Sequence, residues 1–537
     1  MKIFITIQAL LLSAVITTSS CSKSSNTGTT PVTPVVTDTL VPISSYRPLY
    51  HYTPTVNWIN DPNGLLFYNG TYHLFSQYNP SGNTWGNMSW GHATSTDLLS
   101  WQEQPVAITW QKNADNSTSL IFSGSAVADS ANTSGFATQA GQVPLVAVYT
   151  SNNSDVNGNA ISQNQCLAYS LDNGTTWTKY VQNPVLDIQS TQFRDPKVFW
   201  YAPAKEWIMV VSKPDVYKVM FYSSTNLKNW VHLSDFGVLG NIAQVWECPD
   251  LFQLPVEGSA DKKWVLTVSA GGAQPGFGGM QYFIGNFDGT QFTVEKYNYP
   301  LYVDYGKDYY AGVTFNNIPA ADGRTIMVGW ANNWSYAGTI PTTTGYGYRG
   351  QYAIPRSLSL RPVSNGDGYH LLQAPVTQLT NFEATAPTVA NITVNNTSQK
   401  IDTLSGTSLD IQFTVAMGSA TAAGIDLFKG GTQQTTISFN KATSQVTLNR
   451  MQAGRDDFSP QFASIESANI NNGSLSSIKC RILIDQSLVE VFVNDGEYTL
   501  TDLVFPTQAN GNLDFFSQNG DATFSNITIH KVNKCIH

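Results

Sequence analysis

A short motif that returns along the first part of the chain is the feature that most constrains the fold. Residues 95–101 (STDLLSW) return as residues 224–230 (STNLKNW), and the related residues 170–177 (SLDNGTTW) lie between them. The copies start at Ser95, Ser170 and Ser224, so the intervals are 75 and 54 residues. Such intervals are typical of irregular four-stranded β-sheets rather than of a tight solenoid.

The segments around these motifs are predicted to be β-strands. Short runs of alternating apolar and polar residues are separated by Asn-Gly, Asp-Gly and Gly-Gly dipeptides, and no long segment has a 3.6-residue apolar period. Residues 65–75 predict a hairpin whose turn is Asn69-Gly70. Residues 170–177 resemble the Asp-box hairpin of sialidase-like propellers. We therefore predict an all-β protein with a five-bladed β-propeller over residues 46–375, two stacked sandwiches being the alternative.

The pattern changes near Ala384, and residues 376–537 are predicted to form a β-sandwich. Short strand-like runs such as 409–415 and 488–493 continue to the end of the chain. The sandwich could bind sugar, although a packing domain is the simpler interpretation.

The first 45 residues are predicted to direct the protein to its location. Lys2, an apolar run over 3–16 and a small-residue stretch that ends at Cys21 are typical of a signal peptide, and residues 1–21 resemble a lipoprotein signal with Cys21 as the lipidated residue. Thr18 stands where Leu is usual in that motif. Residues 22–45 are rich in Ser, Thr and Pro and predict a tether. We expect a lipid-anchored protein of the bacterial cell envelope, at the outer surface or in the periplasm, with secretion as the second choice. We expect no other membrane attachment.

Composition and spacing exclude several kinds of partner and site. The chain has 37 acidic and 28 basic residues, a net charge of -9, and only 12% charged residues, so a nucleic-acid partner is not expected. The four remaining cysteines and the scattered histidines have no metal-ligand spacing, and we expect neither a metal nor a cofactor. Among these cysteines, Cys480 and Cys535 are the two that the domain arrangement could pair. The oligomeric state cannot be predicted.

Three acid-containing motifs carry the chemistry. They are residues 58–64 (WINDPNG), 193–198 (FRDPKV) and 246–252 (WECPDLF), and each places an acid beside or near Pro among apolar residues. An acid in apolar surroundings needs a partner or a function, because burial disfavours an isolated carboxylate. Two carboxyl groups across a sugar linkage are the minimum for glycoside hydrolysis. A third carboxylate beside Arg194 suits the binding of hydroxyls and of developing positive charge.

These motifs resemble, in the same order, those of glycoside hydrolase family 32, the β-fructosidases. The resemblance extends through residues 75–80 (FSQYNP), 85–92 (WGNMSWGH), 122–125 (FSGS) and 304–311 (DYGKDYYA). The family has a five-bladed propeller followed by a β-sandwich, as predicted above. The resemblance implies a retaining mechanism.

The resemblance also implies roles for individual residues. Asp61 corresponds to the nucleophile, Glu247 to the general acid/base and Asp195 to the transition-state stabiliser. The positions that match the fructose-binding subsite are Asn60, Gln77, Trp85, Phe122, Ser123, Arg194 and Trp330. We expect the three acids to converge in one funnel-shaped pocket, with Asp61 and Glu247 at the retaining distance of about 5 to 5.5 Å, and with Trp85 and Trp330 on its wall.

The sequence departs from the family pattern at three places. Ser76 replaces an aromatic residue, Tyr348 stands in a longer segment (341–350) where Trp is expected, and Ser357 replaces Glu. The last two are predicted to lie on the channel rim.

The leading functional hypothesis is an exo-acting fructan β-fructosidase that releases terminal fructose from levan or inulin, with the polysaccharide or its oligosaccharides as substrate. An endo-levanase or endo-inulinase is the first alternative, and the altered rim is its best argument. A sucrose invertase is the second alternative. A non-catalytic fructan-binding lipoprotein would need a lost catalytic acid, and all three acids are present.

Overall fold

The computed structural model describes residues 46–274, 276–343, 347–363, 368–387, 389–401, 406–470, 477–508 and 511–535. The predicted signal peptide over residues 1–21, with Cys21, and the predicted tether over residues 22–45 lie outside the described residues. Within the described part the regular secondary structure is almost entirely β-strand, and its only helical turns are two 3-10 segments, Pro214–Val216 and Thr377–Phe382. No described helix has both the length and the apolar character needed to cross a membrane.

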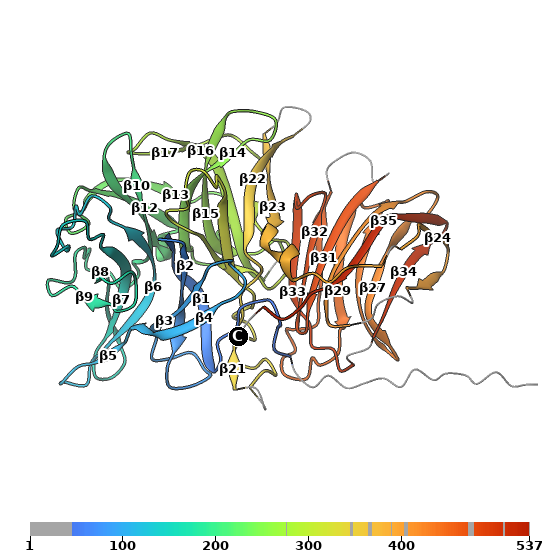
Figure 1. The fold of residues 1–537 in the computed structure, drawn as a ribbon, viewed down its shortest axis with the longest axis horizontal. Coiled ribbons are helices and arrows are strands. Elements are labelled where there is room, and N and C mark those ends of the chain that lie inside the picture. Colours follow the sequence, from blue (N-terminus) through green and yellow to red (C-terminus); the bar gives the residue numbers. More distant parts are fainter. Residues whose placement is uncertain are drawn as a thin grey trace, which may run out of the picture. The chain divides into compact units, whose positions relative to one another are not determined.

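Five sheets of four or five strands fill the region up to Pro375 (Figure 1). The first contains β1 (Asn57–Tyr68), β2 (Thr71–Asn79), β3 (Ser89–Ser95), β4 (Gln102–Ile108) and the short β21 (Tyr348–Arg349). The second contains β5 (Gln111–Lys112), β6 (Thr118–Ala128), β7 (Leu145–Ser154), β8 (Ala160–Ser170) and β9 (Thr178–Lys179). The third contains β10 (Arg194–Tyr201), β11 (Glu206–Lys213), β12 (Lys218–Ser224) and β13 (Val231–Gly237). The fourth contains β14 (Glu247–Pro255), β15 (Lys262–Gly271), β16 (Gly278–Phe287), β17 (Phe292–Val294) and β18 (Leu301–Tyr302). The fifth contains β19 (Tyr310–Thr314), β20 (Thr325–Trp330), β22 (Arg356–Pro362) and β23 (Tyr369–Pro375).

These five sheets are the blades of a propeller. Strands β1, β6, β10, β14 and β19 contact one another in that order, and β19 returns to β1, so they form a closed ring of innermost strands. The bridge between Leu66 and Asn316 joins the first and the last blade. The predicted fold class is therefore confirmed in this region.

The repeated motif marks the turn after the third long strand of a blade. Ser95, Ser170 and Ser224 end β3, β8 and β12. In each copy the indole N–H of the Trp donates to a carbonyl three residues earlier, at 2.9 Å for Trp101 and 3.0 Å for Trp177 and Trp230. The polar turn and the Trp thus form one local unit, which explains why the motif could be recognised in the sequence.

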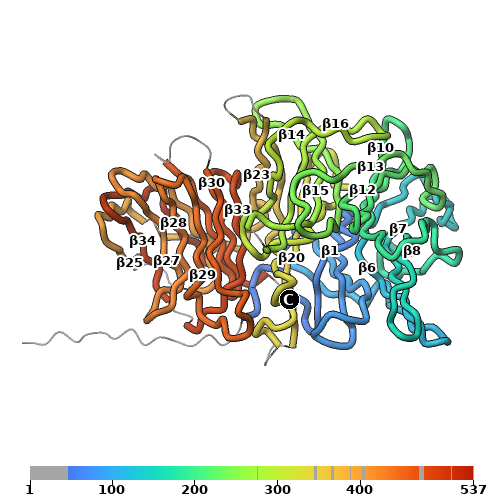
Figure 2. The backbone as a smooth tube through the Cα atoms, turned by 180° about the vertical axis from the view of Figure 1, so that it is seen from behind, coloured from blue at the N-terminus to red at the C-terminus, as the bar shows by residue number. Residues whose placement is uncertain are grey.

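Two six-stranded sheets follow, drawn in orange to red in Figure 1 and Figure 2. One contains β24 (Ile392–Asn395), β35 (Asp521–Lys531), β26 (Ser408–Ala416), β31 (Ile478–Asp485), β32 (Leu488–Val493) and β33 (Tyr498–Leu503). The other contains β25 (Ser398–Lys400), β34 (Asn512–Gln518), β27 (Ala422–Gly430), β28 (Gln433–Asn440), β29 (Gln445–Gln452) and β30 (Ile465–Asn469). Alternate residues of both sheets form one shared apolar core, as a β-sandwich requires.

The possible pairing of Cys480 with Cys535 is not found. Cys166, Cys248, Cys480 and Cys535 are all free and buried. Cys480 points into the sandwich core, whereas Cys535 packs in an apolar cluster with propeller residues such as Leu98 and Trp101. The two thiols therefore belong to different cores.

Buried ion pairs join the fifth blade and its neighbouring loops to the sandwich. Arg356 donates to Asp304 at 3.0 Å and to the Thr501 hydroxyl at 2.6 Å, and Arg450 donates to Asp308 at 2.5 Å. We call this set of five residues (Asp304, Asp308, Arg356, Arg450 and Thr501) the seam. It places the segment 304–311 firmly between strands of both regions.

Candidate active site

A β-bulge interrupts every innermost strand of the propeller at nearly the same level. The register shifts lie between Ile59 and Pro62 in β1, Phe122 and Gly124 in β6, Arg194 and Lys197 in β10, Glu247 and Asp250 in β14, and Tyr310 and Val313 in β19. Pro62, Pro196 and Pro249 have no N–H for the ladder, which favours such an interruption. Bulges redirect side chains and are frequent beside active sites. Here each of the three acids lies at one of them.

The three predicted acids line one pocket of about 350 Å³ at the start of the innermost strands. The lining residues are Asn60, Asp61, Gln77, Trp85, Phe122, Ser123, Gln163, Gln192, Arg194, Asp195, Glu247 and Trp334. Below the acids the channel is filled, and the void enclosed by residues such as Pro62, Asp195, Lys197 and Cys248 has only about 10 Å³, room for about one water molecule. The pocket is therefore closed at its bottom.

Three donors fix the Asp61 carboxylate. Ser123 Oγ donates to Oδ2 at 2.6 Å, Asn60 Nδ2 donates to Oδ1 at 3.0 Å, and Cys248 Sγ lies 3.5 Å from Oδ2. Burial raises the pKa of Asp61, while the hydrogen bonds from Ser123 and Asn60 oppose that shift. The side chain is thus held in one orientation, with a carboxylate that is costly to keep ionised.

Asp195 makes longer contacts with its partners than Asp61 does, and the charges of both other acids act on it. Its Oδ2 accepts the backbone N–H of Cys248 at 3.1 Å, and Arg194 Nε lies 3.9 Å away. Burial raises the pKa of Asp195 to about 7, and the charges of Glu247 and Asp61 act in the same direction against the attraction of Arg194. Asp195 itself has φ = 66°, a left-handed backbone conformation that is uncommon for residues other than Gly and typical of strained functional positions.

Glu247 is held from two sides. Arg194 donates to Oε1 through Nη2 at 2.9 Å and Nε at 3.1 Å, and the Tyr310 hydroxyl donates to Oε2 at 2.6 Å. The Glu247 side chain keeps 23% of its surface exposed, compared with 6% for Asp195. Glu247 is therefore more open to an incoming ligand than Asp195.

Six of the seven predicted binding residues line the pocket, and Trp330 does not. Trp330 is fully buried, with its ring 6.2 Å from that of Trp58. Trp334 lies beside it, with a ring distance of 4.8 Å, and lines the pocket in its place. Because Trp330 ends β20, its side chain packs into the sheet, whereas Trp334 lies in the following turn.

Four pocket-related residues were not identified from the sequence. Trp334 carried a signal, since it follows Trp330 by four residues in an aromatic segment. Tyr310 also carried one, because it lies in the motif at 304–311. Gln163 and Gln192 had no recognisable motif; Gln192 Oε1 accepts a hydrogen bond from Arg194 Nη1 at 2.7 Å, and Gln163 Oε1 accepts one at 3.3 Å.

Tyr348 and Ser357, which were predicted to lie on the channel rim, do not line the pocket. Tyr348 is fully buried, and its hydroxyl donates to the Tyr46 carbonyl at 3.1 Å. Ser357 belongs to β22, the third strand of its blade outward from the channel. Ser76 is buried in β2 and does not line the pocket. None of these three residues is therefore part of the pocket lining.

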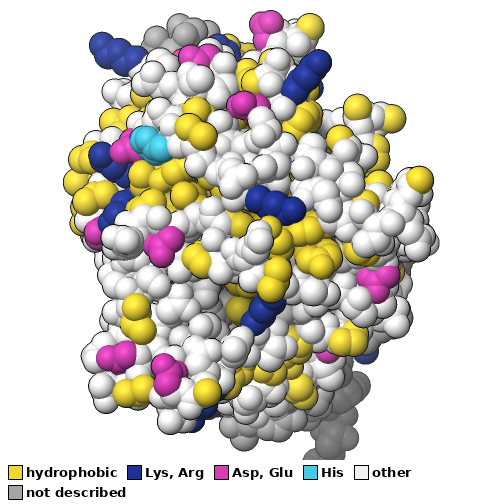
Figure 3. Space-filling view, turned by 90° about the vertical axis from the view of Figure 1, so that its left-hand side faces the viewer, with side chains coloured by type: hydrophobic (Ala, Val, Ile, Leu, Met, Phe, Trp, Pro, Cys, Tyr) yellow, Lys and Arg dark blue, Asp and Glu magenta, His cyan; other side chains and the backbone are white. Residues whose placement is uncertain are grey.

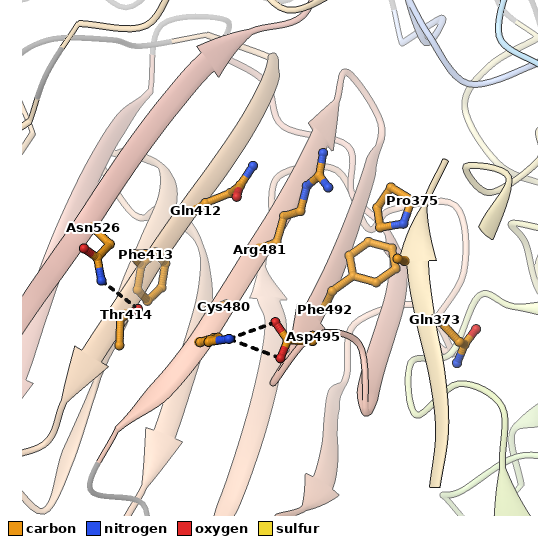
Figure 4. A pocket seen from close by; sticks show the side chains of 12 residues that line it. Gln373, Pro375, Gln412, Phe413, Thr414, Cys480, Arg481, Phe492, Asp495 and Asn526 are labelled. Carbon is orange, nitrogen blue, oxygen red and sulfur yellow. Dashed lines mark hydrogen bonds and ion pairs between the residues drawn. The ribbon is translucent and has the colours of Figure 1, made fainter. Parts of the chain in front are cut away.

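A second pocket of about 410 Å³ lies beside β23 and contains none of the predicted site residues (Figure 4). Its charged side chains are already paired: Arg481 donates to Asp410 at 2.6 Å, and Lys479 lies 3.3 Å from Asp495. Nothing here resembles the group of adjacent acids around Asp61. Within the described ranges, no group of three or more His, Cys, Asp or Glu side chains could hold a metal ion.

The arrangement combines one buried acid, Asp195, two partly exposed acids, Asp61 and Glu247, one arginine and two half-exposed tryptophans. A fixed carboxylate beside a second acid can support displacement at a sugar carbon with proton transfer to the leaving oxygen. Trp85 and Trp334 expose 47% and 46% of their surfaces, which suits stacking against a sugar ring. On one face of the molecule, charged side chains are few and scattered among uncharged ones (Figure 3).

Comparisons with known proteins agree with this geometry. Residues 51–375 match the glycosyl hydrolases family 32 N-terminal domain, and residues 378–531 match the family 32 C-terminal domain. The chain is 42% identical to a levanase of Bacillus subtilis over 499 residues, 91% of this chain and 71% of that protein. It is 39% identical to an extracellular exo-inulinase of Aspergillus niger over 515 residues, 91% of this chain and 94% of that protein. A crystal structure of exo-inulinase from Aspergillus awamori superposes with a TM-score of 0.84 at 36% identity and covers 92% of this chain and 99% of its own.

Proposed function

The chain belongs to glycosyl hydrolase family 32, and from that premise we propose that it releases terminal fructose from levan or inulin. It is a glycoside hydrolase that acts on β-fructofuranosidic linkages, as its levanase and exo-inulinase relatives indicate. The proposal concerns the position of the cut and the roles of the residues.

The closed bottom of the pocket is the observation that carries the exo assignment. The acids lie above a channel filled by residues such as Lys197 and Pro249. A chain end can enter such a pocket, whereas an internal linkage would need a groove that continues past the acids. Within the altered segment at 341–350, Tyr348 pairs with Asn57 at the start of β1, is buried and is not among the residues that line the pocket.

We assign the nucleophile to Asp61, because three donors orient it while its carboxylate remains open to the pocket. An Asp61 oxygen attacks the anomeric carbon as the bond from that carbon to the leaving oxygen breaks. Glu247 gives its proton to the leaving oxygen. Glu247 then takes a proton from water, the water oxygen attacks the anomeric carbon, and Asp61 is released, so the configuration is retained.

Asp195 and Arg194 complete the assignment. Asp195 lies in the same pocket as both other acids and accepts hydrogen bonds from the hydroxyl groups of the sugar. Its negative charge stabilises the positive charge that develops on the ring in the transition state. Arg194 holds Glu247 through two nitrogens, so it orients the proton donor. Trp85 and Trp334 flank the sugar at the pocket mouth.

Chromatography of early products tests this proposal. We expect fructose alone from levan and from inulin at the first time points, and no product from Asp61→Asn under the same conditions. A ladder of oligosaccharides would instead indicate endo action, and turnover of sucrose with none of either polymer would indicate an invertase. Product formation by Asp61→Asn would reject the nucleophile assignment. Polymer binding by a wild-type chain that forms no product would support a non-catalytic binding protein.

We also propose that Cys21 carries a lipid that anchors the enzyme to the cell envelope, with plain secretion as the alternative. The motif at residues 1–21 supports this proposal, and a tethered enzyme suits a polymer too large to import. A single acyl chain binds membranes only weakly, so stable attachment needs more than one chain. Cys21→Ala should move the enzyme from the membrane fraction to the soluble fraction. Retention of this variant in the membrane fraction would exclude a lipid on Cys21 as the anchor.

A further inference from the structure

A third pocket lies at the opposite end of the innermost strands β6 and β10. It has a volume of about 260 Å³ and is lined by Val127, Ala128, Phe199, Trp200, Asn316 and Asn317, with Trp207 behind them. Val127 and Ala128 end β6, and Trp200 is the seventh residue of β10. Arg194 starts β10 six residues earlier, and at about 3.3 Å per residue the two ends of this strand are roughly 20 Å apart.

Trp200 makes this pocket unusual. Among the described tryptophans, three expose more than a third of their surface: Trp85 and Trp334 line the catalytic pocket, and Trp200, at 40%, lines this one. The ring of Trp200 meets that of Trp207 edge to face at 5.0 Å. The Trp207 indole N–H donates to Thr133 Oγ1 at 2.8 Å, so Trp207 is fixed and holds Trp200 in place. Packing accounts for the position of Trp207, whereas much of the Trp200 ring stays open to solvent.

The polar groups of the pocket are uncharged and firmly positioned. Asn316 Nδ2 donates to the carbonyls of Ala126 and Val198, at 2.8 and 2.9 Å, and Asn317 Nδ2 donates to the carbonyl of Phe67 at 2.8 Å. Asn316 thereby uses both of its amide N–H groups and Asn317 uses one of two, so the two side-chain oxygens and one N–H group are left for the hydroxyl groups of a ligand. No charged side chain lines the pocket.

A rigid aromatic face beside fixed amide acceptors fits a neutral polyhydroxylated ring, and 260 Å³ suits about one sugar residue. We propose that this pocket, which we call the distal pocket, is a non-catalytic subsite for a sugar residue of the fructan substrate. This inference depends on the proposed function for the identity of the sugar.

The two pockets cannot hold one chain that passes through the axis, because the channel between them is filled. Lys197 Nζ donates to Asp250 at 3.1 Å and to the Thr314 carbonyl at 2.5 Å in the middle of that channel. A polymer segment in the distal pocket therefore belongs to a part of the chain that loops around the enzyme, or to another chain. Its effect is to raise the local concentration of chain ends near the acids, and short substrates gain nothing from it.

The test compares Trp200→Ala with the wild type on a long levan and on a fructose-containing trisaccharide. We expect the KM for the polymer to rise roughly three- to tenfold, the range that loss of one aromatic contact gives. We expect kcat for the polymer and both constants for the trisaccharide to stay within twofold. Trp200→Phe, which keeps an aromatic face, should lie between the two, and Val231→Ala, an exposed apolar change on the same blade, should match the wild type.

Binding provides a second readout without hydrolysis. In the Asp61→Asn background, Trp200→Ala should weaken retention on a levan-containing gel, and Asn317→Ala should weaken it with Trp200 intact. An unchanged polymer KM together with unchanged retention would overturn the distal pocket, as would an equal loss of activity on polymer and trisaccharide. If the wild type hydrolyses neither substrate, the proposed function fails instead, and the two failures are distinguishable.

Discussion

The propeller contains two groups of buried acids that are treated in opposite ways. In the seam, both carboxylate oxygens of Asp304 accept two hydrogen bonds each. Oδ1 accepts them from the backbone N–H groups of Gly306 and Thr501, and Oδ2 accepts them from the Arg356 guanidinium and the Thr501 hydroxyl. In the pocket, Asp195 has one backbone N–H within hydrogen-bonding distance and lies near the charges of two other acids.

The difference separates structural from catalytic acids. A buried carboxylate with full hydrogen bonding and an arginine partner holds elements together, and removal of the partner is costly. Asp195 has few donors and faces like charges, so its carboxylate opposes folding, and we attribute its presence in the pocket to its chemistry. One segment supplies both regions, since Asp304 and Asp308 belong to the seam while Tyr310 donates to Glu247.

The largest expected effect is loss of the proton donor in the pocket. Glu247→Gln should lower kcat on natural fructan by about 10²- to 10⁴-fold, because no group then protonates the leaving oxygen. A substrate with an activated leaving group should recover part of the first step. Steady-state kinetics on both substrates checks this expectation. Glu257→Gln, the same change at an exposed ion pair with Arg361, should retain full activity; near-wild-type turnover of fructan by Glu247→Gln would contradict the role.

In the seam the expected loss is stability rather than catalysis. Arg450→Met leaves Asp308 buried without its cation and should lower the free energy of unfolding by about 3–5 kcal/mol. Urea unfolding measures this, and kcat per folded molecule should stay within twofold. Lys479→Met breaks a largely exposed pair with Asp495 and should cost less than about 1 kcal/mol. Equal losses in the two variants would remove the distinction between seam and surface.

A smaller loss of activity is expected at Tyr310, which lies in the segment that joins the seam to the pocket. Tyr310→Phe removes the hydroxyl that donates to Glu247 and should lower kcat by roughly 10- to 100-fold with little change in KM, as expected for loss of a hydrogen bond to a charged group of about 1.5–3 kcal/mol. Tyr309→Phe is the matched control, because the buried Tyr309 hydroxyl has no hydrogen-bond partner among the described residues. If both variants lose activity equally, Tyr310 acts through packing and not through its hydroxyl.

The smallest expected effect is a gain in the free energy of unfolding, on replacement of Asp195. The pKa of Asp195 is raised to about 7 in the folded protein from an ordinary value of 3.8, so its cost to folding develops as pH rises from about 4 to 7 and is complete above 7. Asp195→Asn should therefore stabilise the fold at pH 7.5 by on the order of 1 kcal/mol while it abolishes activity. Urea unfolding at pH 4, 5.5 and 7.5 should show the gain vanish at the lowest pH. A gain that is independent of pH would mean that the carboxylate charge is not its source.

Much of the fold was predictable because its signals are local. The Asn69-Gly70 turn and the three Trp-containing turns each form within a few residues, and the structure has them where the sequence predicts. The bulges were not predicted, although Pro62, Pro196 and Pro249 mark three of them. A bulge depends on how the partner strand continues its ladder, and the sequence of one strand does not contain that information.

The sequence by itself determined which residue types could perform the chemistry: three acids beside prolines, an arginine next to one of them, and aromatic residues around them in an all-β chain. The tertiary structure decided which way each side chain faces. It buried Trp330 and left Trp334 in the pocket, directed Cys480 and Cys535 into different cores, and divided the acids between seam and pocket. The physical reason is that donors and packing partners come from distant strands, as when Ser123 and Cys248 hold Asp61 from positions 62 and 187 residues away. Only the closed ring of blades brings those strands to one axis.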